Sequence, residues 1–61
     1  MNLKDYLHFN NITSAKMARN LNITGNYMRM IRLGRAIPSM ALAEKIELLT
    51  GGEVTVKELR G

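Results

Sequence analysis

The sequence has 61 residues, no cysteine and one histidine, which limits it to one small domain without a disulfide or a thiolate metal site. Hydrophobic residues make up 46% of it but only three residues are aromatic, so a core must come from aliphatic side chains on packed helices or from dimerisation. The net charge of +4 is uneven: residues 1–36 carry six Lys and Arg against one Asp, and residues 37–61 carry three against four Glu, which is typical of a domain with one face toward a polyanion.

The first predicted element is a helix that ends at Asn10-Asn11. Its apolar residues are spaced for one helix face, and they are Leu3, Tyr6, Leu7 and Phe9. We expect the two aromatic side chains among them to belong to the core. His8 is expected to be a structural residue at or near the surface, because one histidine cannot build a metal site alone.

The second helix is expected to run from Ser14 to Asn20. Thr13 is its predicted N-cap, because a threonine hydroxyl can accept a hydrogen bond from a free backbone N–H of the first turn. Three residues are expected to point inward, and they are Met17, Ala18 and Leu21. Asn22 tolerates the left-handed backbone conformation and is expected to end this helix.

The third helix is expected to run from Gly25 to Leu33, with Thr24 as its N-cap. Met28 and Ile31 have the spacing of an inward face. Gly34 stands where a glycine commonly follows the end of a helix.

The segment SMALAEKIELLT, residues 39–50, has the strongest helix propensity in the chain. Pro38 stands where helices often begin, and Ser39 is an alternative cap. The predicted inward residues are Leu42, Ala43, Ile46 and Leu49. Gly51-Gly52 is expected to end the helix.

The C-terminal segment fits two structures. The alternation of Val54 and Val56 is compatible with a strand, whereas Thr55 followed three residues later by Glu58 is typical of a capping box. We favour a short last helix, with Val54 and Leu59 covering the core. The predicted fold is therefore all-α, a compact domain of five short helices over residues 1–61.

The second and third predicted helices form the pattern of a helix-turn-helix, in which a three-residue turn joins a first helix to a basic one. Ala18 is small where the two helices must approach closely, and Ile23 can fill the corner between them. The predicted outer face of the third helix, which is the second of this pair, carries Gly25, Asn26, Tyr27, Arg29, Met30 and Arg32. A helix with such a face fits the major groove of DNA.

Five of these residues are predicted to contact bases. Asn26 can pair with an adenine, and Arg29 with a guanine or a phosphate. Met30 offers an apolar surface to a thymine methyl group, and Gly25 lets the start of the helix approach closely. The hydroxyl of Tyr27 can reach a phosphate or a base.

Phosphate contacts are expected on either side of the base contacts. Ser14 and the free backbone N–H groups in the first turn of the second helix are expected to form an anion site. Arg32 and Arg35 flank Gly34, where the chain would leave the groove, and Lys16 is a further candidate. Such contacts position a protein on DNA without reading its sequence.

The segment TSAKMARNLNITGNYMRMIRLGR resembles the helix-turn-helix of the lambda repressor-like family, which includes the phage Cro regulators. It has Asn22 where that family commonly has Gly, and Gly25 and Asn26 where glutamine or serine is usual. The tail IPSMALAEKIELLTGGEVTVKEL is similar to small Cro-type regulators and to YdaS-like antitoxin relatives. The resemblance implies binding of operator DNA as a two-fold dimer, with bases read from Gly25, Asn26, Tyr27, Arg29 and Met30 and a backbone contact from Ser14.

We therefore predict a sequence-specific DNA-binding transcriptional regulator, a phage or prophage Cro-type repressor that blocks polymerase from its operator. We expect a homodimer at least on DNA, without cofactor, metal, small-molecule substrate or membrane, in the cytoplasm of a bacterial host cell. The candidate dimer surfaces are the exposed edge of the fourth helix and the C-terminal segment with Val54, Val56 and Leu59.

The rival class is a helical protein-interaction module, such as an antitoxin whose main partner is a protein. An enzyme is not expected, because the sequence has no Ser-His-Asp set, no glycine-rich phosphate loop and no paired carboxylates in a basic cleft. A membrane-surface peptide needs one long amphipathic helix, which Asn22, Gly34 and Pro38 interrupt. No apolar run approaches a membrane span, and the first residues lack the apolar stretch of a signal peptide.

Overall fold

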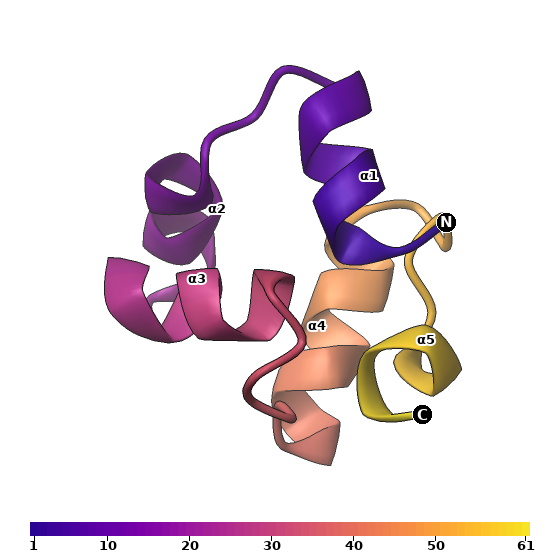
Figure 1. Ribbon diagram of the computed structural model, residues 1–61. Coiled ribbons are helices and arrows are strands. Elements are labelled where there is room, and N and C mark those ends of the chain that lie inside the picture. Colours follow the sequence, from indigo (N-terminus) through magenta and orange to yellow (C-terminus); the bar gives the residue numbers. More distant parts are fainter.

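The computed structural model describes residues 1–61 and contains five short helices and no strand (Figure 1). In chain order they are α1 Leu3–Phe9, α2 Ser14–Leu21, α3 Gly25–Arg32, α4 Met40–Leu49 and α5 Val56–Arg60. The predicted all-α fold of five short helices is confirmed, and the last segment is a helix rather than a strand. The longest helix, α4, has 10 residues, and none combines the length and the apolar character that crossing a membrane requires.

Every helix begins at a residue whose side chain accepts a hydrogen bond from the backbone N–H three residues later. These N-cap residues are Asn2, Thr13, Thr24, Ser39 and Thr55. The caps predicted at Thr13 and Thr24 are thus confirmed, and Ser39 rather than Pro38 caps α4. Because each cap satisfies an N–H that the helix itself leaves free, the caps fix where these short helices start.

The ends of α2 and α3 share one backbone arrangement, in which a residue with positive φ reverses the chain. Asn22 has φ 58°, and the N–H of Ile23 donates to the carbonyl oxygen of Ala18 over 3.0 Å. Gly34 has φ 75°, and the N–H of Arg35 donates to the carbonyl oxygen of Met30 over 2.8 Å. These bonds satisfy carbonyl groups that the helix leaves free, so the predicted ends at Asn22 and Gly34 are confirmed.

The core is a single cluster of ten buried side chains contributed by α1 to α4 and by the segment before α5. They are Leu3, Leu7, Met17, Ala18, Leu21, Met28, Ile31, Leu42, Ile46 and Val54. The helix α2 packs against α3 and also contacts α4, and α5 packs against α4. In Figure 1, α1 and α4 lie between the α2–α3 pair and α5. The inward residues predicted for α2 and α3 are all buried, as are Ala43 and Ile46 of α4.

Two residues predicted for the core lie at the surface. Phe9 is 78% exposed, because it lies about 200° around the helix from Leu7, which faces inward. Leu49 is 46% exposed, because the buried face of α4 turns from Leu42 toward Ala43 and leaves Leu49 at its edge. The aromatic residue Tyr6 is half-buried and packs against the core cluster, as predicted.

Side chains from α4 and α5 hold the last helix in place. The N–H of Val56 donates to Glu47 Oε1 over 2.8 Å, which satisfies a free N–H in the first turn of α5. At the other end of this helix, Arg60 Nη1 donates to the carbonyl oxygen of Pro38 over 3.0 Å. The five-residue helix α5 is thus joined to α4 and to the segment that precedes α4.

The start of the chain is also attached to α5. The Met1 ammonium lies 2.8 Å from Glu58 Oε2 and donates to the carbonyl oxygen of Glu53 over 2.9 Å. Glu58 also completes the predicted capping box with Thr55. The hydrogen bond from the Met1 ammonium, followed by that from the Thr55 backbone N–H, holds the pKa of the Glu58 carboxyl below its ordinary value.

Candidate nucleic-acid interface

The connection between α2 and α3 consists of residues 22–24. Asn22 reverses the chain, Ile23 is half-buried against the core, and Thr24 accepts a hydrogen bond from the N–H of Tyr27 over 3.1 Å. Ala18 is buried in the core. Each residue of the predicted turn therefore has the structural role expected for it, and the two helices are connected without a flexible loop.

The first turn of α3 and its middle present polar side chains to solvent. Gly25, Asn26 and Arg29 are exposed, as predicted. The neighbouring residues Tyr27 and Met30 are half-buried, so they do not project fully into solvent as the prediction of an outer face requires. The ring of Tyr27 packs against the core because it lies one turn before the buried Ile31 on the same side of α3.

Charge on this surface is not neutralised within the protein. The only ion pair joins the Met1 ammonium to Glu58, so none of the nine Lys and Arg side chains pairs with a carboxylate. The segment from residue 13 to residue 36 contains no Asp or Glu. The α2–α3 pair therefore carries an uncompensated positive potential that favours an anionic partner.

The residues predicted to bind phosphate lie in three places. Ser14 is half-buried at the start of α2, where its own N–H and that of Ala15 make no hydrogen bond in the protein. Lys16 is exposed on the next part of α2, and Arg35 is exposed after α3. Arg32 is half-buried, and its Nε is shielded from solvent without a hydrogen-bond partner.

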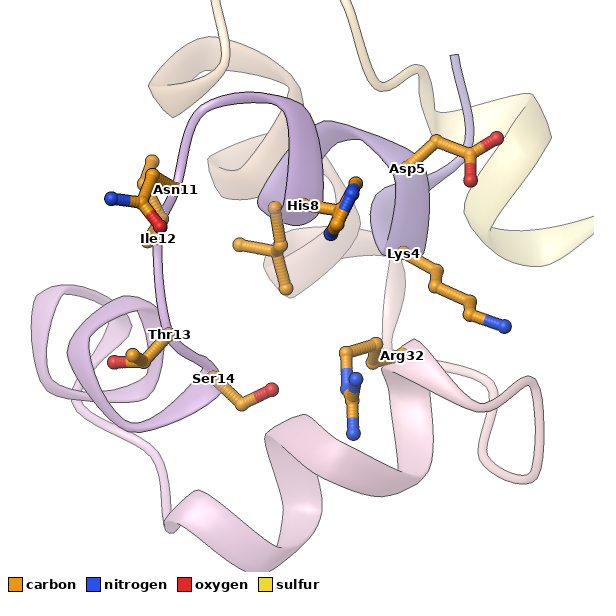
Figure 2. A pocket seen from close by; sticks show the side chains of 9 residues that line it. Lys4, Asp5, His8, Asn11, Ile12, Thr13, Ser14 and Arg32 are labelled. Carbon is orange, nitrogen blue, oxygen red and sulfur yellow. The ribbon is translucent and has the colours of Figure 1, made fainter.

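Two of these predicted phosphate ligands, Ser14 and Arg32, line a cleft of about 610 Å³ together with residues of α1 (Figure 2). Its lining residues come from α1, the following connection, the start of α2 and the end of α3, and they are Lys4, Asp5, Leu7, His8, Asn11, Ile12, Thr13, Ser14 and Arg32. The sequence analysis predicts Ser14 and Arg32 as separate phosphate ligands and includes no residue of α1. The available signal was the spacing of Lys4 and His8, which places both on one side of a helix.

No protein-family model matches the chain, and comparison with curated proteins and with solved structures gives no match either. The resemblance to the lambda repressor-like family therefore rests on the residues quoted for it.

Proposed function

We propose that the protein is a sequence-specific DNA-binding transcriptional regulator in which α2 and α3 act as a helix-turn-helix. The observation that carries this proposal is the unneutralised basic surface of the α2–α3 pair, from which Asn26 and Arg29 project without a partner in the protein. Polar and cationic side chains on the exposed side of a helix are the groups that read base edges in the major groove.

In this proposal α3 enters the major groove and its exposed residues read bases. Asn26 pairs with an adenine and Arg29 with a guanine, while Gly25 allows close approach of the helix start. Tyr27 and Met30 contribute from their half-buried positions at the side of α3. Ser14, Lys16, Arg32 and Arg35 contact phosphates and set the orientation of the domain.

One small domain makes few base contacts, so we propose that two copies occupy a near-palindromic operator and act as a Cro-type repressor in a bacterial cytoplasm. Of the two candidate dimer surfaces, the outer edge of α4 is the more available. Leu48 is 82% exposed and Leu49 is exposed beside it, whereas Val54 is fully buried and Leu59 is half-buried.

The second candidate is a protein-interaction module such as an antitoxin. The same exposed Leu48 and Leu49 support it, because they line a shallow hollow with Asn20, Leu21 and Lys45. A protein partner that covers this hollow would bury leucine side chains that are otherwise in water.

The experiment that tests the proposal is a binding-site selection on randomised duplex DNA at two salt concentrations, with Arg29→Ala as a parallel sample. An enriched two-fold motif that Arg29→Ala fails to enrich supports the reading of bases by a dimer. An enriched single half-site supports α3 as the recognition helix and removes the dimer. Salt-sensitive binding without a motif contradicts sequence-specific regulation, and absence of binding transfers the support to the protein-interaction module.

A further inference from the structure

We propose that the cleft between α1, the start of α2 and the end of α3 holds one phosphate group of the DNA backbone. Arg32 is its main ligand, and Lys4 and His8 make α1 part of the interface. This inference rests on the proposed function and extends it to a helix that the sequence reasoning left outside the site.

The state of Arg32 is the first argument. Its side chain is half-buried and its Nε is covered without a partner. No side-chain N–H of Arg32 donates to an acceptor in the protein, and no carboxylate pairs with the side chain. A covered N–H without an acceptor is unfavourable unless a ligand supplies one. Phosphate matches the planar fork of a guanidinium, since two of its oxygens can accept two parallel hydrogen bonds.

The other groups around the cleft favour an anion. Lys4 and His8 lie one turn apart on α1, and Ser14 begins α2, where two backbone N–H groups are free. Figure 2 shows the Ser14 hydroxyl and the Arg32 guanidinium lying across the same space. The one acidic residue at the cleft, Asp5, forms no ion pair with the basic residues, and its carboxylate points away from Arg32 (Figure 2).

The position of Arg32 on α3 identifies the source of the phosphate. Arg32 lies one turn after Arg29, so the two side chains are neighbours along the helix. A helix whose Arg29 reaches a base edge places Arg32 beside the DNA strand that borders the groove. The cleft, at about 610 Å³, is larger than one phosphate and leaves room for the adjoining sugars.

The test uses a duplex from the binding-site selection, in which single phosphates are replaced in turn by uncharged methylphosphonates. One replacement is expected to weaken wild-type binding about tenfold and to have a clearly smaller effect on Arg32→Gln, because the main contact of that phosphate is already removed. Arg32→Gln is expected to lower the slope of log affinity against log salt by about 0.9, the value for one phosphate, and Lys4→Ala is expected to lower it by no more than that. Lys57→Ala, which removes an exposed charge on α5, is the matched control and should leave binding unchanged.

A second measurement needs no variant of the cleft. The Nε–H resonance of Arg32 is followed by NMR while either the duplex or inorganic phosphate at matched ionic strength is added. A shift with the duplex at stoichiometric amounts supports the assignment. A shift with inorganic phosphate but none with the duplex overturns it in favour of a free phosphate ligand.

The outcomes separate this inference from the proposed function. If wild-type protein selects a DNA motif but Lys4→Ala and Arg32→Gln bind it like Lys57→Ala, the phosphate assignment is wrong and the DNA-binding function stands. If the wild-type protein binds no DNA and the Arg32 resonance does not move, both are wrong. Circular dichroism of each variant shows whether it is folded before its affinity is compared.

Discussion

The hydroxyl of Thr50 accepts a hydrogen bond from the backbone N–H of Val54 over 3.1 Å inside the protein. Thr50 is the one buried polar residue, and its hydroxyl also lies 3.2 Å from the carbonyl oxygen of Glu47, to which it donates. A single side chain therefore satisfies the backbone where the chain turns from α4 toward α5. This contact lets Val54 enter the core without leaving a buried N–H unpaired.

Thr50→Val should lower the free energy of unfolding by about 1–3 kcal/mol, because it keeps the shape of the side chain but leaves the Val54 N–H without an acceptor. Thr50→Ser keeps the hydroxyl and is the matched control. Urea unfolding followed by circular dichroism measures both. A midpoint for the valine variant equal to that of the wild type would show that the hydrogen bond contributes nothing.

Asn22→Ala should destabilise the protein by about 1 kcal/mol, because alanine is strained at a φ of 58°. Asn22→Gly should leave stability unchanged or higher, since glycine adopts this conformation without strain. The measurement is the thermal midpoint of each variant. A loss of stability in the glycine variant as large as that in the alanine variant would mean that the Asn22 side chain, and not the backbone conformation, is what matters.

Arg29→Ala should weaken binding to the selected DNA motif by about 1–3 kcal/mol, while binding to random duplex changes little, because Arg29 is proposed to read a base. Titrations of both duplexes by fluorescence anisotropy measure the two affinities. The same loss on both duplexes would assign Arg29 to a phosphate.

Arg35→Ala should weaken binding to all duplexes by a similar factor and reduce the salt slope by about one. Arg35 is exposed just after the turn at Gly34, so its removal leaves the core untouched. Affinities at several salt concentrations give the slope, with Lys57→Ala as a charge-matched control far along the chain. A slope equal to that of wild type would exclude a phosphate contact by Arg35.

Glu58→Gln should make the stability of the protein less sensitive to acid. The folded-state pKa of Glu58 lies below its ordinary value of 4.5, so its ion pair with Met1 stabilises the fold above that pH and is lost as the pH falls through the lowered pKa. Glutamine keeps the capping box but not the charge. Unfolding midpoints between about pH 5 and pH 3 measure the effect, with Glu44→Gln on the exposed side of α4 as the control. Identical dependence of stability on pH in the wild type and in Glu58→Gln would contradict the role of this ion pair.

Local sequence signals predicted the helices well, because caps and ends are decided by residues within one turn. Thr24 and Asn22 each act on backbone groups three to five positions away, so their effect is visible in the sequence. The inward faces of α2 and α3 could also be predicted, because Met28 and Ile31 follow the helix period.

The failures arise where tertiary packing decides. Phe9 is apolar and near Leu7 in sequence, but α1 is too short to bury more than one face. Leu49 lies about two helical turns after Leu42 on a similar side of α4 and yet is exposed. The side of α4 that packs against its neighbours depends on the other helices and cannot be predicted from the sequence of α4 alone. For the same reason sequence reasoning missed the cleft that joins Lys4 to Arg32, since the two residues meet only in the folded chain.

Two methionine side chains are fully buried in this protein, whereas no aromatic residue is. Met17 and Met28, one from each helix of the α2–α3 pair, are enclosed, whereas Met1 and Met40 are exposed. Oxidation turns a flexible apolar thioether into a polar sulfoxide, which the space between two packed helices cannot accept. The packing of α2 against α3, the candidate recognition helix, is thus sensitive to oxidation. An oxidant reaches these two methionines only when α2 and α3 separate, so the rate of that separation limits the rate of damage.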